Sequence, residues 1–129
     1  MKRKTVFSLA LFLTALMGCT TIQPDRDGIA RAGIGQTAYV GGPRVTPLAV
    51  MEDSRCPMNA RCVWAGQVRL TVRIDTGSGY VTREITSNKP VPVADGSLEL
   101  VEVTPNQVAG GDPIRRIDYR FGFKFSGGS

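Results

Sequence analysis

The 129-residue sequence contains no histidine. Nucleophile activation and general-base catalysis most often use that residue, so Ser-His-Asp and Cys-His arrangements are excluded. Few lysines are available for a catalytic serine–lysine pair, because Lys89 and Lys124 are the only lysines beyond residue 4. Glu52 and Asp53 adjoin, but neighbouring residues on a strand point to opposite faces. We therefore predict that the protein is not an enzyme and has no catalytic residues.

Cysteine is also scarce, with only Cys19, Cys56 and Cys62. A structural zinc site takes four Cys, His or carboxylate ligands, so we predict no metal site and no cofactor. A redox pair is a weaker alternative for Cys56 and Cys62, because redox motifs usually separate their cysteines by two residues. In an oxidising compartment a structural disulfide between these two cysteines is the expected outcome.

The N-terminus has the pattern of an export signal. Three basic residues at positions 2–4 precede an apolar run at 6–17, which is too short to span a bilayer comfortably. The end of the run, Leu16-Met17-Gly18-Cys19, resembles a bacterial lipobox. That resemblance implies a lipoprotein signal peptide at 1–18, cleavage after Gly18 and a diacylglyceryl thioether on Cys19. The alternatives are an uncleaved anchor or an ordinary signal that contains a cysteine.

This interpretation determines the compartment and the charge. Thr20, rather than aspartate, follows Cys19, which favours the outer membrane facing the periplasm over inner-membrane retention. Removing the three basic residues of the signal leaves thirteen basic against eleven acidic residues, a net charge of +2. Nucleic-acid binding calls for a concentrated basic face, so we predict no nucleic-acid partner. The expected partners are the membrane, through the lipid, and an envelope protein or other ligand.

The rest of the chain shows no helical periodicity. Residues 19–36 lack apolar periodicity and are predicted to form a lipidated flexible tether, and residues 127–129 a disordered end. The domain is then 37–126. Short strands are expected at 37–40 and 45–51, with Pro47 at an edge or a bulge. Residues 67–75 alternate apolar and polar side chains, as a half-buried antiparallel strand does, and 76–79 read as the turn of a hairpin to 80–86.

The C-terminal half gives three further predictions. Residues 87–96 are rich in proline and glycine and read as a loop. The apolar phase changes between Leu100 and Val101, which indicates either two covered faces or a β-bulge. Residues 104–116 form the longest irregular connection, and 117–125 place five large apolar side chains on one face, as in a central core strand. The whole predicts an all-β antiparallel sandwich or small barrel of about six to seven strands.

The stretch Asp53–Gly66, DSRCPMNARCVWAG, carries the strongest resemblance in the chain. It is similar to a DSRCP-x4-CVWAG pattern in a group of uncharacterised small bacterial lipoproteins that also have a lipobox. Members of that group tend to have an aspartate–tyrosine pair before a final strand, which Asp118 and Tyr119 match. The resemblance implies a lipidated β-domain, and it implies no biochemical activity.

Three residues of this stretch are candidates for binding a partner. Arg55 and Arg61 flank the cysteines and could recognise a carboxylate, a phosphate or a protein; the alternative is a solvated pair or an arginine bonded to backbone carbonyls. Trp64 could be an exposed anchor. We favour the other interpretation, in which this tryptophan packs on the disulfide within the core.

The sequence therefore predicts a membrane-anchored envelope lipoprotein whose domain is a non-enzymatic binding or interaction module. Its contact surface would be the 53–66 loop, with the 104–116 loop as a second contributor. One alternative is an inhibitor of an envelope or host enzyme, acting through a loop that the disulfide pre-organises. Exposure of Arg55 or Arg61 at the loop tip would favour inhibition. Another alternative is a purely structural envelope protein, which a surface without an apolar patch would favour.

Overall fold

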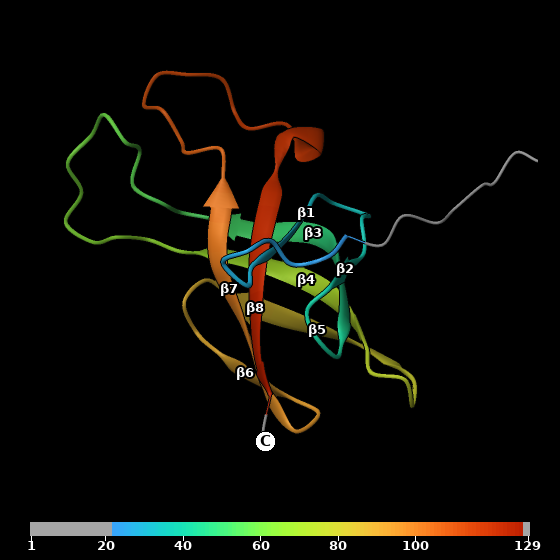
Figure 1. Cartoon of the computed structure of the whole chain (residues 1–129). Coiled ribbons are helices and arrows are strands. Elements are labelled where there is room, and N and C mark those ends of the chain that lie inside the picture. The colour runs from blue at the N-terminus through green and yellow to red at the C-terminus, as the bar shows by residue number, and fades with distance from the viewer. Residues whose placement is uncertain (1–21, 128–129) are drawn as a thin grey trace, which may run out of the picture.

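The computed structural model describes residues 22–127, which form two four-stranded antiparallel sheets packed as a sandwich rather than a closed barrel (Figure 1). The fold class predicted from the sequence is confirmed. The described residues contain eight strands, one or two more than expected. Their bounds are β1 Ala30–Ala32, β2 Ala38–Tyr39, β3 Arg44–Asp53, β4 Val68–Asp75, β5 Tyr80–Thr86, β6 Val91–Val93, β7 Gly96–Thr104 and β8 Arg120–Gly127.

The first sheet has the order β2-β3-β4-β5, so its strands follow one another along the chain. Its clearest member is β4, whose residues alternate in burial as the sequence pattern predicts. Pro47 coincides with a register shift between β3 and β4, which confirms the expected bulge. The predicted hairpin between β4 and β5 is also present, and the Thr76 N–H donates to the Gly79 carbonyl across 3.1 Å.

The second sheet has the order β1-β8-β7-β6. A register shift between Leu100 and Glu102 shows that, of the two alternatives for the change of phase in β7, the bulge is the one present. Strand β8 lies between two neighbours and buries Phe121 and Phe123 completely. The side chains of the two sheets enclose one core of sixteen buried residues: Ala30, Ala32, Ala38, Val40, Val45, Val68, Leu70, Val72, Ile74, Ile85, Val93, Leu98, Leu100, Tyr119, Phe121 and Phe123.

Two segments that the sequence predicts to be irregular contain strands. Strand β1 lies within the stretch 19–36 that was expected to be a tether, and Ala30 and Ala32 are fully buried against β8. Between them Arg31 points to the surface and pairs with Glu102 on β7 at 2.9 Å. Three residues with only two small apolar side chains give no visible period, so the strand depends on its partner. The predicted loop 87–96 likewise contains β6, a three-residue strand paired with β7.

The last strand begins later than predicted. A 3-10 turn at Arg116–Asp118 (η1) precedes β8, and Ile117 is 69% exposed instead of facing the core. Tyr119 follows this turn and is buried. The predicted disordered end overlaps the structure at one residue, because Gly127 ends β8. The predicted signal peptide 1–18 and the lipidation site Cys19 lie outside the described residues. Within residues 22–127, no helix is long and apolar enough to cross a membrane.

Candidate functional site

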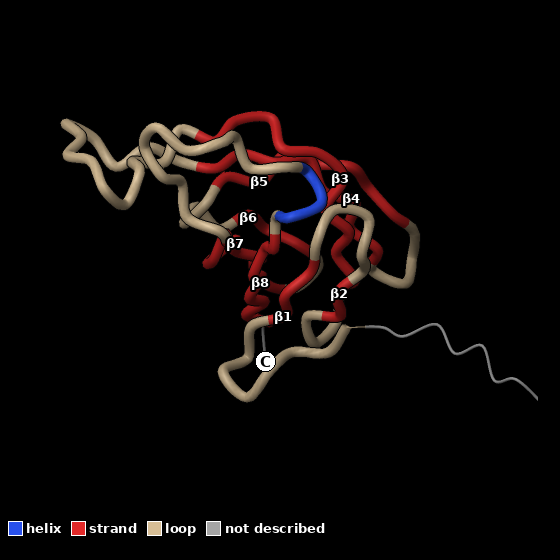
Figure 2. Tube along the Cα trace, turned by 90° about the horizontal axis from the view of Figure 1, so that it is seen from above, coloured by secondary structure: helices blue, strands red, loops and turns tan. Residues whose placement is uncertain are grey.

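Two long loops project side by side from one end of the sandwich. One joins β3 to β4 and corresponds to residues 54–67; the other, residues 105–115, leads from β7 to η1. Both are at the upper left in Figure 1. Figure 2, which looks down on this end, shows the second loop running across the strands to the 3-10 turn. The two loops come from different sheets, so they meet only because the sandwich brings these strand ends together.

The base of the first loop is closed by hydrogen bonds between Ser54 and Gln67. The Ser54 N–H donates to the Gln67 carbonyl at 2.9 Å, and the Gln67 N–H donates to the Ser54 hydroxyl oxygen at 3.0 Å. Gly66 makes this closure possible, because its φ of +68° disfavours other residues. A Cβ at this position would lie 1.8 Å from the Ser54 carbonyl oxygen.

The outer part of the same loop is held by the predicted disulfide. Cys56 and Cys62 are bonded, with a Cα–Cα distance of 5.9 Å. The Cys56 N–H also donates to the Ala65 carbonyl at 3.3 Å. A cross-link and a closed base together restrict the conformations of the loop, which lowers the entropy cost of binding.

The two loops are joined directly to each other. The Met58 N–H donates to the Gln107 carbonyl at 3.0 Å. Asn59 spans the gap with its side-chain amide, which accepts from the Ala109 N–H at 2.7 Å and donates to the Ala109 carbonyl at 3.3 Å. These contacts make the loops one surface rather than two independent segments.

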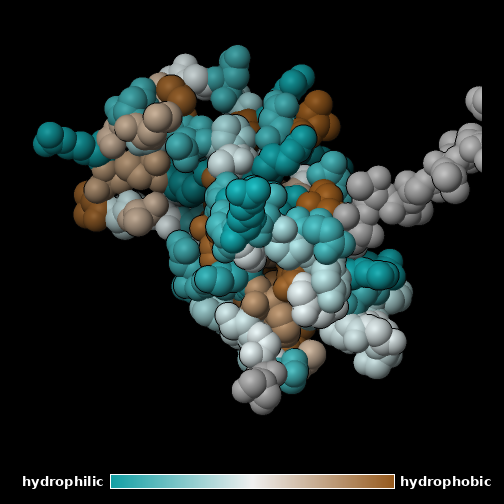
Figure 3. All heavy atoms as spheres, in the orientation of Figure 1, coloured by the Kyte–Doolittle hydropathy of each residue, from teal (hydrophilic) through white to brown (hydrophobic). Residues whose placement is uncertain are grey.

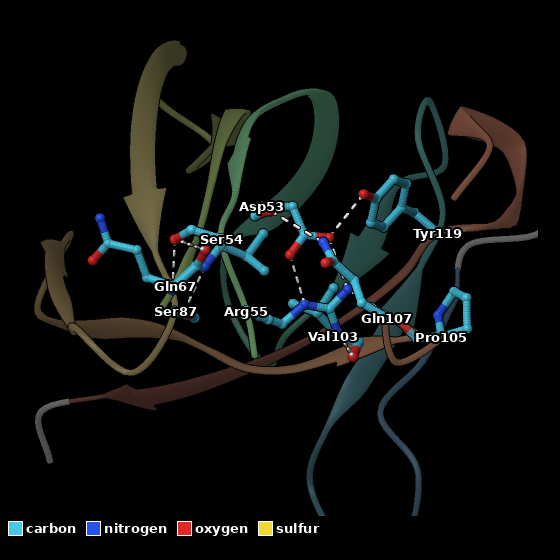
Figure 4. Close-up of polar contacts among 10 residues, drawn as sticks. Asp53, Ser54, Arg55, Gln67, Ser87, Val103, Pro105, Gln107 and Tyr119 are labelled. Atoms are coloured by element: carbon cyan, nitrogen blue, oxygen red, sulfur yellow. Dashed lines mark hydrogen bonds and ion pairs between the residues drawn. The ribbon is translucent and has the colours of Figure 1, made fainter. Parts of the chain in front are cut away.

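Arg55 connects this surface to the sandwich through hydrogen bonds (Figure 4). Its guanidinium donates to both carboxylate oxygens of Asp53 at 2.8 and 2.9 Å, and to the carbonyls of Val103 and Pro105 at 2.9 and 3.0 Å. Four of the five guanidinium N–H groups are thereby used. The alternative of an arginine bonded to backbone carbonyls is the one observed, and Arg55 serves the loop framework.

Tyr119 completes the anchor from the second sheet. Its hydroxyl donates to the Asp53 carboxylate at 2.9 Å, and the Gln107 side chain donates to the Asp53 carbonyl at 3.1 Å (Figure 4). The Asp53 side chain is only 7% exposed. Sequence reasoning identified the pair Asp118-Tyr119 only through a resemblance, and no local pattern linked Tyr119 to a residue 66 positions earlier.

The electrostatics of this anchor are those of a satisfied ion pair. Burial alone would raise the pKa of Asp53, but the hydrogen bonds from Arg55 and Tyr119 outweigh burial and lower it to about 2. Burial and the adjacent carboxylate raise the pKa of Tyr119 to about 12. Both groups therefore stay in their usual charge states at neutral pH, which suits a structural link better than proton transfer.

Four large apolar side chains are exposed on the joined loops. The exposed fractions are 70% for Met58, 94% for Val63, 74% for Trp64 and 52% for Val108. We call these four residues, together with the exposed Arg61, the apex patch. Figure 3 shows apolar atoms gathered at this end of the molecule. The prediction that Trp64 packs in the core is wrong, because the disulfide loop extends beyond the sheets and offers no core to pack against.

A cavity of about 780 Å³ lies under the second loop, with Asp53 and Tyr119 among its lining residues. Its charged side chains are largely paired within the protein: Arg115 with Asp118 at 2.8 Å, and Asp53 with Arg55. Among residues 22–127, no group of three metal-ligating side chains is present. The apex patch is therefore the feature of this end that is most available to a partner.

The geometry defines a two-sheet β-sandwich that presents two loops, joined by hydrogen bonds and carrying exposed apolar side chains. The sequence matches no protein-family model, and it has no significant match among curated proteins or solved structures.

Proposed function

We propose that this protein is a non-enzymatic envelope module that binds another protein through the apex patch. The observation that carries the proposal is the exposure of four large apolar side chains on loops that are cross-linked and hydrogen-bonded in place. Contiguous exposed apolar groups on a soluble domain usually mark an interaction site. Tryptophan and methionine are enriched at protein interfaces, and tryptophan often contributes most of the binding energy.

The framework beneath the patch supports a binding role. Arg55, Asp53 and Tyr119 use their polar groups on one another and on the loop backbone, so they hold the patch in one conformation. A partner would then lose little free energy to ordering of the loops. The absence of histidine from the chain, and the pairing of Asp53 with its neighbours, favour binding over catalysis.

The proposal can be tested by photo-cross-linking in intact cell envelopes. A photoreactive amino acid replaces Val63, the most exposed apolar residue of the apex patch, and a matched control places it at Ser78 in the exposed β4–β5 turn. We expect one discrete adduct with another protein from position 63, no adduct with that protein from position 78, and loss of the position-63 adduct when Trp64→Ala is added. Equal adducts from both positions, or none from position 63, would contradict the proposal.

Inhibition of an enzyme is a second candidate, and the exposure of Arg61 favours it. This residue lies inside the disulfide loop, between the cross-linked cysteines, and it is exposed. A constrained loop with one basic group fits an apolar cleft that carries a carboxylate. If the adduct from position 63 contains an enzyme, that enzyme should regain activity with Arg61→Ala and Trp64→Ala variants in a purified assay.

We also propose that Cys19 carries the lipid and that the protein is held at the outer membrane. The sequence Leu16-Met17-Gly18-Cys19 supports this proposal. Ile22, the first described residue, forms a β-bridge with Ala38, which pairs with the start of β3. The 54–67 loop follows the opposite end of β3, at Asp53. A ten-residue strand is about 30 Å long, so an anchor near Ile22 would leave the apex patch facing away from the membrane.

Mass spectrometry of the mature N-terminus tests the proposed lipid anchor on Cys19. An acylated Cys19 is expected, together with its loss and release of the protein from membranes in Cys19→Ser. An unmodified N-terminus at any other residue would contradict this proposal and leave the binding proposal standing.

A further inference from the structure

The four sheet edges of the described structure differ in length. Strands β1, β2 and β6 each end a sheet with only two or three residues, whereas β5 ends the first sheet with seven. Short edge strands are one of the ways in which proteins prevent pairing with another chain. Strand β5 contains neither proline nor lysine, which are two further ways. Among the four terminal strands of the two sheets, β5 is therefore the one long enough to pair with another strand over several residues.

The register shows which backbone groups of β5 are free. The hydrogen bond between Thr76 and Gly79 closes the hairpin. Because hydrogen-bonded and non-hydrogen-bonded pairs alternate along antiparallel strands, Ile74–Val81 and Val72–Arg83 are hydrogen-bonded pairs. The alternate residues of β5 then direct their N–H and carbonyl groups away from β4. These are Tyr80, Thr82 and Glu84.

Two large side chains near the turn end of this edge are more than half exposed. Tyr80 is 62% and Val81 is 53% exposed. Val81 is on the core-facing side, since it pairs with the buried Ile74, but β6 opposite it is too short to cover it. A cavity of about 330 Å³ remains there between β5 and β6. Another strand along β5 would satisfy the backbone groups and bury both side chains.

Arg83 is the residue that could oppose such pairing, because charges that point inward often protect an edge. Its guanidinium instead donates to the Pro92 carbonyl at 2.6 Å, so the side chain reaches across to β6 and leaves the backbone edge of β5 open.

We propose that a second copy of this chain occupies the edge, with the two β5 strands antiparallel about a two-fold axis at Thr82. The sheets β2-β3-β4-β5 of the two copies then form one eight-stranded sheet. This register places Tyr80 opposite Glu84 and Val81 opposite Arg83 of the second copy, so unlike residues face each other. Axes at Arg83 or Glu84 would oppose like charges, which destabilises a strand pair.

Cysteine cross-linking tests the register in the full-length protein within its envelope. The axis puts Thr82 opposite its own copy, about 5.5 Å apart between Cα atoms, which suits a disulfide. Thr82→Cys should form a covalent dimer under mild oxidation. Ser78→Cys, on the exposed turn, is opposite Thr86 of the second copy, so the two cysteines of this dimer lie about 27 Å apart. This variant should cross-link at least about tenfold less, because the geometry of the dimer does not bring its thiols together. Equal cross-linking of both variants, or none of Thr82→Cys, overturns the proposal.

A proline variant tests the backbone pairing. Thr82→Pro removes an N–H that makes no bond to β4, and proline is tolerated at such edge positions. Thr82→Val keeps the N–H and serves as the control. In detergent-matched sedimentation equilibrium we expect dimers for the unmodified protein and Thr82→Val, and monomers for a Thr82→Pro variant that retains its circular dichroism spectrum. A monomeric unmodified protein, or a dimeric Thr82→Pro variant, overturns the proposal. The apex-patch variant Trp64→Ala should remain dimeric, since its loop lies at the far end of the sandwich from the β4–β5 turn.

Discussion

Replacing Asp53 by asparagine removes one charge from the anchor beneath the loops and changes its shape very little. The Asp53 carboxylate is 7% exposed and accepts two hydrogen bonds from Arg55 and one from Tyr119. Its pKa falls from 3.8 to about 2. At about 1.36 kcal/mol per pKa unit, this shift corresponds to about 2.5 kcal/mol of folding free energy. We expect Asp53→Asn to lower the free energy of unfolding by about that amount at pH 7.

The pH dependence distinguishes this cause from a general packing defect. Because the folded-state pKa is lowered, the stabilisation is fully present above about pH 4 and is lost as the pH falls through about 2. Urea titrations of the two proteins between pH 7 and pH 2 measure the difference directly, and the other carboxylates contribute equally to both. The difference should shrink from about 2.5 kcal/mol toward zero.

A matched variant controls for the chemistry of the change. Asp75→Asn alters the same functional group in an exposed pair, since Arg73 lies 3.4 Å away and its side chain is 45% exposed. That change should cost less than about 1 kcal/mol at any pH. If Asp53→Asn costs as little, or if its cost is constant down to pH 2, the charge of Asp53 does not hold the loops and our account of the anchor is wrong.

Three further predictions concern the loop itself. Replacing Cys56 and Cys62 by serine should lower the free energy of unfolding by about 2 kcal/mol, as chain entropy gives for so short a loop, and an unchanged urea midpoint would contradict this. Gly66→Ala should cost at least about 3 kcal/mol, because the new Cβ meets the Ser54 carbonyl, whereas Gly77→Ala, also at positive φ but in open space, should cost about 1 kcal/mol; equal melting shifts would refute the steric argument. Trp64→Ala should change the free energy of unfolding by less than about 0.5 kcal/mol. In the unmodified protein, acrylamide should quench the fluorescence of this single tryptophan as readily as in the unfolded chain, and a protected, blue-shifted emission would show that Trp64 is buried.

The alternation of apolar and polar residues predicts most of the strands in the two sheets, but it predicts little about the conformation of the loops. The residues of β4 alternate over its full length, so the period alone identifies the strand and its buried face. The bulge in β7 was visible as a change of phase. Strand β1 was not visible, because two alanines around an arginine form a strand only when β8 supplies the hydrogen bonds and Glu102 supplies the countercharge.

The position of Trp64 shows where sequence reasoning fails at the site. A tryptophan beside a disulfide commonly packs on it, but the surroundings of this loop are set by Gln107 and Ala109, about fifty residues further on. The same holds for Arg55, whose acceptors are the carbonyls of Val103 in β7 and of Pro105 in the loop that follows β7. Such long-range pairings leave no periodic trace. The disulfide could therefore be predicted from the sequence, whereas the arginines and Trp64 could be identified only as candidates.

The link between Asp53 and Tyr119 also sets an order of events for newly made chains. One partner ends β3 and the other immediately precedes β8, the last strand. The Arg55 acceptors likewise follow from β7. The first sheet can form from consecutive hairpins while the C-terminal strands are still emerging, but the loops cannot take their final positions until β8 has docked. The surface that we propose for partner binding is therefore completed last. A chain that stops before Tyr119 would carry the disulfide loop without the contacts that fix its position.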